Sequence, residues 1–153
     1  MIDVYPGVEK FLFDDHGKLA SMLKSMPYKK YIFTNAREKE ASQALSALGV
    51  HDCFEEQIYG ADFLGAICKP QKDAFENVLN DIGVSPKDCV FFEDSIKNLV
   101  TGKELGMSTV LIQGFTAHEE DGTLDVVGMF DAVVSTLTDG GEELSASYPS
   151  LFV

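Results

Sequence analysis

Short apolar runs alternate with segments of helical periodicity along most of the chain. The runs predict buried strands in five places, the last of them weaker: 29–34, 57–60, 88–92, 108–113 and 131–135. Between them, apolar residues three and four positions apart predict four helices: 17–26, 35–49, 71–82 and roughly 95–105. Strands that alternate with helices form a mainly parallel sheet covered on both faces. We therefore predict an α/β fold with three layers in a Rossmann-like arrangement.

The helical periodicity also predicts which side chains enter the core. The expected buried positions are Leu19, Met22, Leu23, Met26, Ala41, Ala44, Leu45, Leu48, Ala74, Phe75, Val78, Leu79, Ile82, Ile96, Leu99 and Val100. The first helix should end at Pro27, which cannot continue a helix. The second should begin at Asn35 as its cap, with Glu38 three residues later completing a capping box.

A chain of 153 residues suffices for one domain with a real core. We expect a single domain over residues 1–153 in three parts, a leading segment, a motif-bearing core and a C-terminal part: 1–16, 17–113 and 114–153. The C-terminal part should hold a surface loop over 114–130 with a short helix near Thr123–Val127, then an edge strand and an acidic tail.

The chain is acidic, with a net charge of −13 and no Lys or Arg after Lys103. Nucleic acid and anionic membranes need clustered Lys and Arg, so we expect neither as a partner, and a solvated acidic surface is the ordinary explanation. No apolar run approaches a membrane span and no secretory pattern opens the sequence, so we expect a cytoplasmic protein. Three cysteines without CxxC spacing suggest buried, reduced thiols: Cys53, Cys68 and Cys89.

Polar residues that suit phosphate chemistry follow the predicted strands. Thr34 ends one strand with a hydroxyl, and free amides opening the next helix would attract an anion. Lys69, held before a proline, offers a fixed cation. Glu93 and Asp94 end the strand VFF, and adjacent carboxylates suit a hard divalent ion such as Mg²⁺. Because ligands bind beyond the carboxyl ends of parallel strands, these groups should share one crevice.

Each of these features also has an ordinary structural explanation. A Thr-Asn pair after a strand is commonly a helix cap, a Lys-Pro pair a loop, and a Glu-Asp pair the cap of the following helix. The order and spacing of the three therefore carry the signal.

That order resembles the haloacid dehalogenase (HAD) superfamily of phosphohydrolases. YIFTNA (31–36) is similar to the family's second motif, CKPQKDAF (68–75) to its third and VFFEDSIKN (90–98) to its fourth. The likeness runs from about residue 17 to at least residue 113. The IFTNA and EDS forms look most like the pyrimidine 5′-nucleotidase-like branch.

The resemblance implies a site and a cofactor. By this resemblance, Thr34 and Asn35 bind phosphate, and Lys69 neutralises charge on the phosphoryl group and the nucleophile. Glu93 and Asp94 would hold Mg²⁺, and Ser95 and Asn98 would support the metal loop. The implied substrate is a small phosphorylated molecule, with nucleoside 5′-monophosphates as candidates.

The family's first motif, DxDx[TV], has no convincing match. In FLFDDHGKL (11–19) the second position after Asp14 is His16 where the family has Asp, and the interval to Thr34 leaves little room for the family's flap. We interpret Asp14 and Asp15 as the turn into the first helix. A degenerate first motif is the alternative.

On this interpretation the family's first, central strand and its cap domain are missing or substituted. That strand would lie between those ending at Thr34 and Asp94, and its loss would leave two unpaired edges. We expect the place to be filled by direct pairing of these strands, by residues 2–14, or by a second chain. The run VEKFLF (8–13) is the best candidate.

Two functional hypotheses follow. One is a Mg²⁺-dependent phosphomonoesterase acting on small phosphates; the other is a non-catalytic HAD-like module, inactive or truncated, without the Asp nucleophile. A receiver domain would need its acid pair near the N-terminus, which is the reverse of the order found here. Because the lack of a central strand would leave strand edges unpaired, we expect self-association or a complementing second chain more readily than for a complete sheet.

Overall fold

The computed structural model describes residues 17–113, 128–137, 139 and 141–153. It confirms an α/β, Rossmann-like fold with parallel strands. In chain order, the strands are β1 (Ile32–Phe33), β2 (Ile58–Tyr59), β3 (Val90–Glu93), β4 (Ser108–Ile112) and β5 (Ala132–Val134). The α-helices are α2 (Lys18–Ser25), α3 (Glu38–Ala47), α4 (Ala61–Leu64), α5 (Lys72–Ile82), α6 (Ile96–Glu104) and α7 (Glu142–Ser147). Short 3₁₀ turns cover His51–Cys53, Pro86–Asp88 and Pro149–Phe152.

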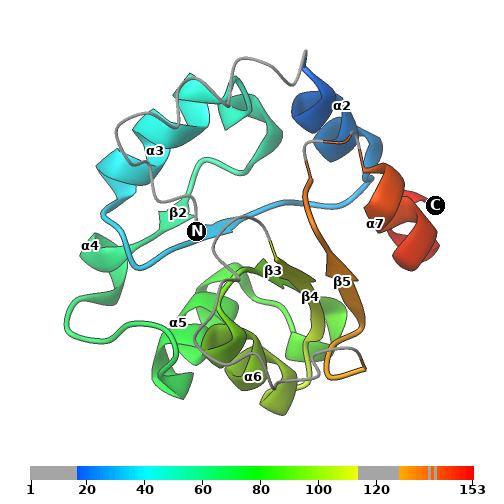
Figure 1. Cartoon of the computed structure of the whole chain (residues 1–153). Coiled ribbons are helices and arrows are strands. Elements are labelled where there is room, and N and C mark those ends of the chain that lie inside the picture. Colours follow the sequence, from blue (N-terminus) through cyan, green and yellow to red (C-terminus); the bar gives the residue numbers. More distant parts are fainter. Residues whose placement is uncertain (1–16, 114–127, 138, 140) are drawn as a thin grey trace.

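The sheet comes in two parallel pieces (Figure 1). In one, β1 pairs with β2, with Ile32 opposite Ile58. In the other, the strand order is β3-β4-β5, with Phe91 opposite Thr109 and Leu111 opposite Val133. Within the described residues, β1 and β3 are not paired with each other.

Neighbouring residues on β4 show the three layers. Val110 packs in a cluster with Met22 of α2 and Leu144 of α7, whereas Leu111 packs with Phe75 of α5 and Leu99 of α6. Because successive side chains of a strand point to opposite faces, α2 and α7 cover one face and α5 and α6 the other. The predicted core faces of the helices are confirmed at the positions that are buried: Leu19, Met22, Leu23, Met26, Ala44, Leu45, Ala74, Phe75, Val78, Leu79 and Leu99.

The second helix begins later than predicted. Helix α3 starts at Glu38 with Arg37 as its N-cap residue, so the predicted Asn35 cap and its capping box with Glu38 are wrong. The Glu38 carboxylate instead accepts hydrogen bonds from the backbone amides of Gly60, Asp62 and Phe63 at the start of α4. A side chain at Gly60 would meet the Ala36 carbonyl oxygen at 2.6 Å, so this loop packs closely against the turn after β1.

The C-terminal part is more ordered than the predicted tail. Helix α7 and the following 3₁₀ turn bury Leu144 and Leu151 against the α2 side of the core. The predicted helix near Thr123–Val127 lies outside the described residues, as does most of the predicted loop over 114–130. The expectation of buried thiols is wrong for Cys68, which is exposed. Among the described helices, none has the length and apolar character to cross a membrane.

Candidate active site at the carboxyl ends of β1 and β3

The predicted site residues gather where β1 and β3 end. Thr34 follows β1, Glu93 closes β3, and Lys69 reaches both strands from the loop before α5. We call the group formed by Thr34, Asn35, Lys69, Glu93 and Asp94 the polar rim.

Lys69 is the centre of the polar rim. Its side chain is 1% exposed, and Nζ donates to Glu93 Oε2 at 2.6 Å and to the Phe33 carbonyl oxygen at 2.8 Å. The ammonium also lies 4.9 Å from the ring centroid of Phe33 and 5.5 Å from that of Phe91. One buried cation therefore ties the end of β1 to the end of β3, with aromatic faces adding cation–π stabilisation.

Asn35 fixes the backbone of Lys69. Its Nδ2 donates to the Lys69 carbonyl oxygen at 3.0 Å, and its Oδ1 accepts from the Lys69 amide at 2.9 Å. On the other side of the loop, the Thr101 hydroxyl donates to the Pro70 carbonyl oxygen at 2.8 Å. These bonds hold the lysine in position. The phosphate-binding role of the Asn35 side chain stays a prediction, since both its polar atoms have partners within the protein.

Glu93 is buried and heavily hydrogen-bonded. Besides Lys69, its carboxylate accepts from Asn98 Nδ2 at 3.0 Å and from the amides of Asp94 and Ser95 at 3.0 and 3.2 Å. Burial alone would raise the pKa of Glu93, but hydrogen bonding with Asp94 and the charge of Lys69 outweigh it and hold the pKa well below its ordinary value. The Glu93 carboxylate is thus ionised and is held in place before any ligand binds.

Asp94 differs from its neighbour because it is exposed. Desolvation of its carboxyl, together with the adjacent Glu93, raises the pKa of Asp94 to about 6. Within the described residues, no group of three or more His, Cys, Asp or Glu side chains could hold a metal. Mg²⁺ commonly binds one or two carboxylates and completes its shell with water and phosphate oxygens. The donor set therefore fits a hydrated Mg²⁺ on Asp94, while the oxygens of Glu93 are already engaged.

Thr34 presents a hydroxyl beside this network. The residue is 3% exposed, its amide donates to the Tyr59 carbonyl oxygen, and Oγ1 accepts from the Ala36 amide at 3.0 Å. A hydroxyl that accepts one bond still carries a proton it can donate. The Ala36 amide, predicted to be free at a helix start, is occupied by this bond.

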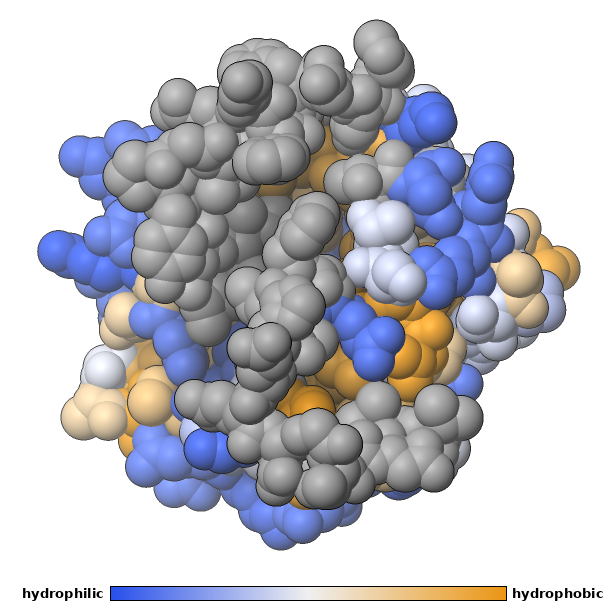
Figure 2. All heavy atoms as spheres, in the orientation of Figure 1, coloured by the Kyte–Doolittle hydropathy of each residue, from blue (hydrophilic) through white to orange (hydrophobic). Residues whose placement is uncertain are grey.

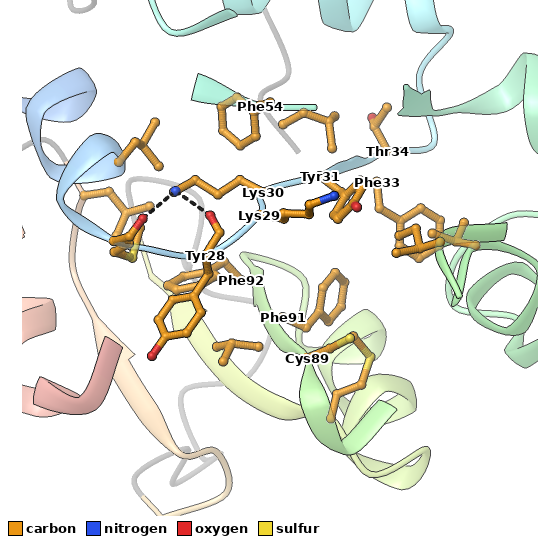
Figure 3. Close-up of a pocket in the computed structure, with 18 of the residues that line it drawn as sticks. Tyr28, Lys29, Lys30, Tyr31, Phe33, Thr34, Phe54, Cys89, Phe91 and Phe92 are labelled. Carbon is orange, nitrogen blue, oxygen red and sulfur yellow. Dashed lines mark hydrogen bonds between the residues drawn. The ribbon is translucent and has the colours of Figure 1, made fainter. Parts of the chain in front are cut away.

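A large cavity, which we call the strand gap, lies between β1 and β3 beside the polar rim. Its volume is about 1230 Å³. Phe33 and Phe91 face it from the two strands, and Thr34 lines it at the polar rim (Figure 3). Figure 2 shows patches of hydrophobic side chains toward the middle of this side of the molecule, with many hydrophilic ones around them. Sequence reasoning missed the roles of Phe33 and Phe91, which lie within the quoted motifs, and of Thr101, which follows the last of them.

The chain is similar to known hydrolases. A family model for haloacid dehalogenase-like hydrolases matches residues 2–106. The protein YhcW of Bacillus subtilis (strain 168), which carries a provisional phosphatase name, is 30% identical over 107 residues, covering 70% of this chain and 44% of that protein. Enolase-phosphatase E1 of Komagataella phaffii is 21% identical over 133 residues, covering 86% of this chain and 53% of the relative.

Among solved structures, a HAD family hydrolase from Deinococcus radiodurans R1 with bound phosphate and sodium superposes with a TM-score of 0.67 at 19% identity. That match covers 90% of this chain and 60% of the other. At this identity the likeness shows the shared fold. The chain thus spans about half the length of the curated relatives it matches.

Proposed function

The chain belongs to the haloacid dehalogenase-like hydrolase family, and from this membership and its polar rim we propose that it serves in the hydrolysis of small phosphomonoesters. Nucleoside 5′-monophosphates are the candidate substrates, and Mg²⁺ is the candidate cofactor. The observation that carries the proposal is the buried Lys69–Glu93 pair, which joins the ends of two parallel strands beside Thr34 and Asp94.

The chain's own residues would bind and orient the phosphoryl group. The Thr34 hydroxyl can donate to one phosphoryl oxygen. Lys69, held by Asn35 and Glu93, supplies a fixed positive charge that costs no reorganisation when negative charge develops. Asp94 would hold Mg²⁺, which supplies neutralisation of phosphoryl charge when bound. The attacking group is not assigned to any described residue.

A second function, a module that binds phosphate without turnover, is favoured by one observation. The stretch FLFDDHGKL does not match the family's first motif, so none of its residues is assigned as the nucleophilic aspartate. Loss of a covalent nucleophile lowers kcat on the order of 10⁶-fold in other enzymes, whereas binding groups elsewhere in a site can persist.

One experiment separates the two functions. The purified chain is assayed with p-nitrophenyl phosphate and then with nucleoside 5′-monophosphates, in Mg²⁺ and in EDTA. The comparison variants are Asp94→Ala and Glu76→Ala, which removes an exposed carboxylate on α5. A phosphohydrolase shows Mg²⁺-dependent turnover that falls to background in Asp94→Ala and is retained in Glu76→Ala.

The binding module gives a different result in the same samples. Turnover is at background in every variant, but inorganic phosphate with Mg²⁺ raises the unfolding temperature of the unmodified chain and of Glu76→Ala, and not that of Asp94→Ala. If neither turnover nor a phosphate-dependent shift is found, both functions are excluded for this chain.

A further inference from the structure

We propose that Phe63 is a specificity-determining residue beside the polar rim, and that its ring stacks on an aromatic group in the leaving group of the phosphate ester. The contact favours phosphomonoesters whose leaving group carries a planar ring, a class that includes nucleoside 5′-monophosphates. The inference rests on the proposed function, because it adds a second contact to a ligand whose phosphoryl group lies at Thr34 and Lys69.

Phe63 lies at the same edge of the sheet as the polar rim. Strands β1 and β2 are parallel, with Phe33 opposite Tyr59, and the Thr34 amide donates to the Tyr59 carbonyl oxygen at 2.9 Å. Gly60 is therefore the neighbour of Thr34 across the two strands, and α4 begins directly after it (Figure 1). Phe63 follows within the first turn of α4, so its Cα lies within about 10 Å of the Thr34 Cα. A nucleotide whose phosphate contacts Thr34 can extend its base across such an interval.

The loop that joins Phe63 to Lys69 is held at both ends by residues that follow β1. We call this loop, residues 60–69, the wall loop. At its start, the Glu38 carboxylate accepts from the Phe63 amide at 2.9 Å. At its end, the Asn35 side chain bonds both the amide and the carbonyl oxygen of Lys69. The positions of the aromatic residue and of the lysine are thus set by the same turn of the chain before a ligand binds.

The ring of Phe63 is supported by one neighbour and remains open to another. Its centroid lies 4.9 Å from that of Tyr59, and the ring planes meet at 84°, edge to face. Tyr59 is buried and its hydroxyl donates to Asp81 at 2.8 Å, so the supporting ring is itself held in place. In an edge-to-face pair, each ring keeps at least one face uncovered by the other. Because Phe63 is also 39% exposed, a second aromatic group can stack on it with little loss of side-chain freedom.

Its place in the fold distinguishes Phe63 from other exposed apolar side chains. In the described part of the chain, the exposed large hydrophobic residues are Tyr28, Phe63, Val84 and Val153. Tyr28 and Val84 precede β1 and β3, so they lie at the amino edge of the sheet, and the Tyr28 hydroxyl donates to the Val153 carbonyl oxygen at 3.5 Å. Of these four residues, only Phe63 lies at the carboxyl edge, where parallel sheets bind their ligands.

Two phosphate esters that differ only in the base test the inference. Uridine 5′-monophosphate and ribose 5-phosphate share the phosphate and the sugar. With Mg²⁺ present, we expect the unmodified chain to show a KM about 3- to 10-fold lower for the nucleotide, the range of one aromatic contact. Phe63→Ala should raise the KM of the nucleotide to that of the sugar phosphate and leave kcat within about twofold, since a contact made equally in the ground and transition states changes KM alone.

Two further variants complete the comparison. Phe63→Tyr keeps an aromatic ring and should retain the preference for the nucleotide. Tyr28→Ala removes an exposed aromatic ring at the amino edge and should also leave the preference unchanged. If the chain hydrolyses neither ester, the proposed hydrolysis fails, and the dissociation constants of the same two esters, measured by isothermal titration calorimetry, decide the inference in all four proteins.

Three results would overturn the inference while leaving hydrolysis at the polar rim intact. Equal KM values for the two esters in the unmodified chain show that no contact to the base exists. A Phe63→Ala variant that weakens both esters alike shows that the ring only supports the wall loop. A preference that is lost equally in Tyr28→Ala shows that the effect is not specific to the carboxyl edge. If neither ester is turned over or bound, the inference and the proposed function both fail.

Discussion

The polar rim and the strand gap lie against each other, yet they are held in opposite ways. At the rim, side chains from distant parts of the sequence are joined by short hydrogen bonds, and Lys69 and Glu93 are almost completely buried. In the gap, apolar side chains from both helical layers surround two strands that are not paired with each other within the described residues. The rim is therefore organised by side-chain contacts and does not depend on direct pairing of β1 with β3.

The largest effect should come from breaking the rim at its centre. Lys69→Met leaves the Glu93 carboxylate buried without its cation, and removal of one partner of a buried pair typically costs about 3–5 kcal/mol. Urea unfolding measures the loss. The matched control is Lys72→Met, because Lys72 pairs with Glu104 at the surface and its loss should cost no more than about 0.5 kcal/mol. Equal losses in the two variants would contradict a preorganised rim.

The next largest loss of stability should come from the strand gap and should leave binding at the polar rim unchanged. Leu144→Ala removes a fully buried side chain of α7 that lines the gap, and we expect a loss of about 2–4 kcal/mol. The polar rim of this variant should still bind inorganic phosphate with Mg²⁺ at temperatures where the variant is folded. Ser145→Ala, on the exposed side of the same helix, should change the unfolding free energy by less than about 0.5 kcal/mol. If phosphate with Mg²⁺ no longer raises the unfolding temperature of Leu144→Ala, the structure of the polar rim depends on packing in the strand gap.

A pH-dependent effect on stability is expected at Glu38, the first residue of α3. Partial burial would raise the pKa of Glu38, but the amides of Phe63 and Asp62 lower the pKa to about 2. The folded-state pKa lies below the unfolded value, so the carboxylate stabilises the fold above about pH 4.5, and this contribution is lost as the pH falls toward 2.

We expect Glu38→Gln to cost about 1–2 kcal/mol at pH 7, the scale of hydrogen bonds to charged groups. The cost should shrink as the pH falls toward 2, followed by urea unfolding across this range. Glu40→Gln, at an exposed position of the same helix, is the control. A difference between Glu38→Gln and the unmodified chain that does not vary with pH would sink this assignment.

The smallest effect on stability should come from Asp94, because it is exposed. In EDTA, Asp94→Asn should change the unfolding free energy by less than about 0.5 kcal/mol. In Mg²⁺, we expect the unmodified chain to gain thermal stability and Asp94→Asn to gain none, since ligands that bind the folded state raise its stability. Differential scanning calorimetry with and without Mg²⁺ measures the gain. An equal rise in thermal stability in both proteins would show that Asp94 does not hold the ion.

The sequence predicted the order of the elements and the meeting of Thr34, Lys69, Glu93 and Asp94, because these depend on local periodicity and on strand ends that share one edge. It did not predict the partners of Asn35 and Glu38. Both residues fit a local capping box by spacing, and only tertiary contacts, to Lys69 and to the loop before α4, outcompete that local bonding.

Helix α7 was missed for a different reason. Its six residues, EELSAS, are too few to show helical periodicity, and the acidic pair at its start suggested a solvated tail. Its place is fixed by Leu144, which is buried against α2, and by Gly141. Gly141 adopts a positive φ and comes so close to Met22 that an added Cβ would lie 2.5 Å from the methionine Cγ.

The Lys69–Glu93 ion pair also affects how a phosphate ester would reach the rim. The pair is neutral as a whole, so it does little to offset the field of a chain whose net charge is −13. A phosphate dianion approaching from solution is therefore repelled at long range and attracted only within contact distance of the lysine. Added salt should accelerate the encounter by screening the repulsion, which is the opposite of its usual effect on enzymes that steer anions with surplus positive charge.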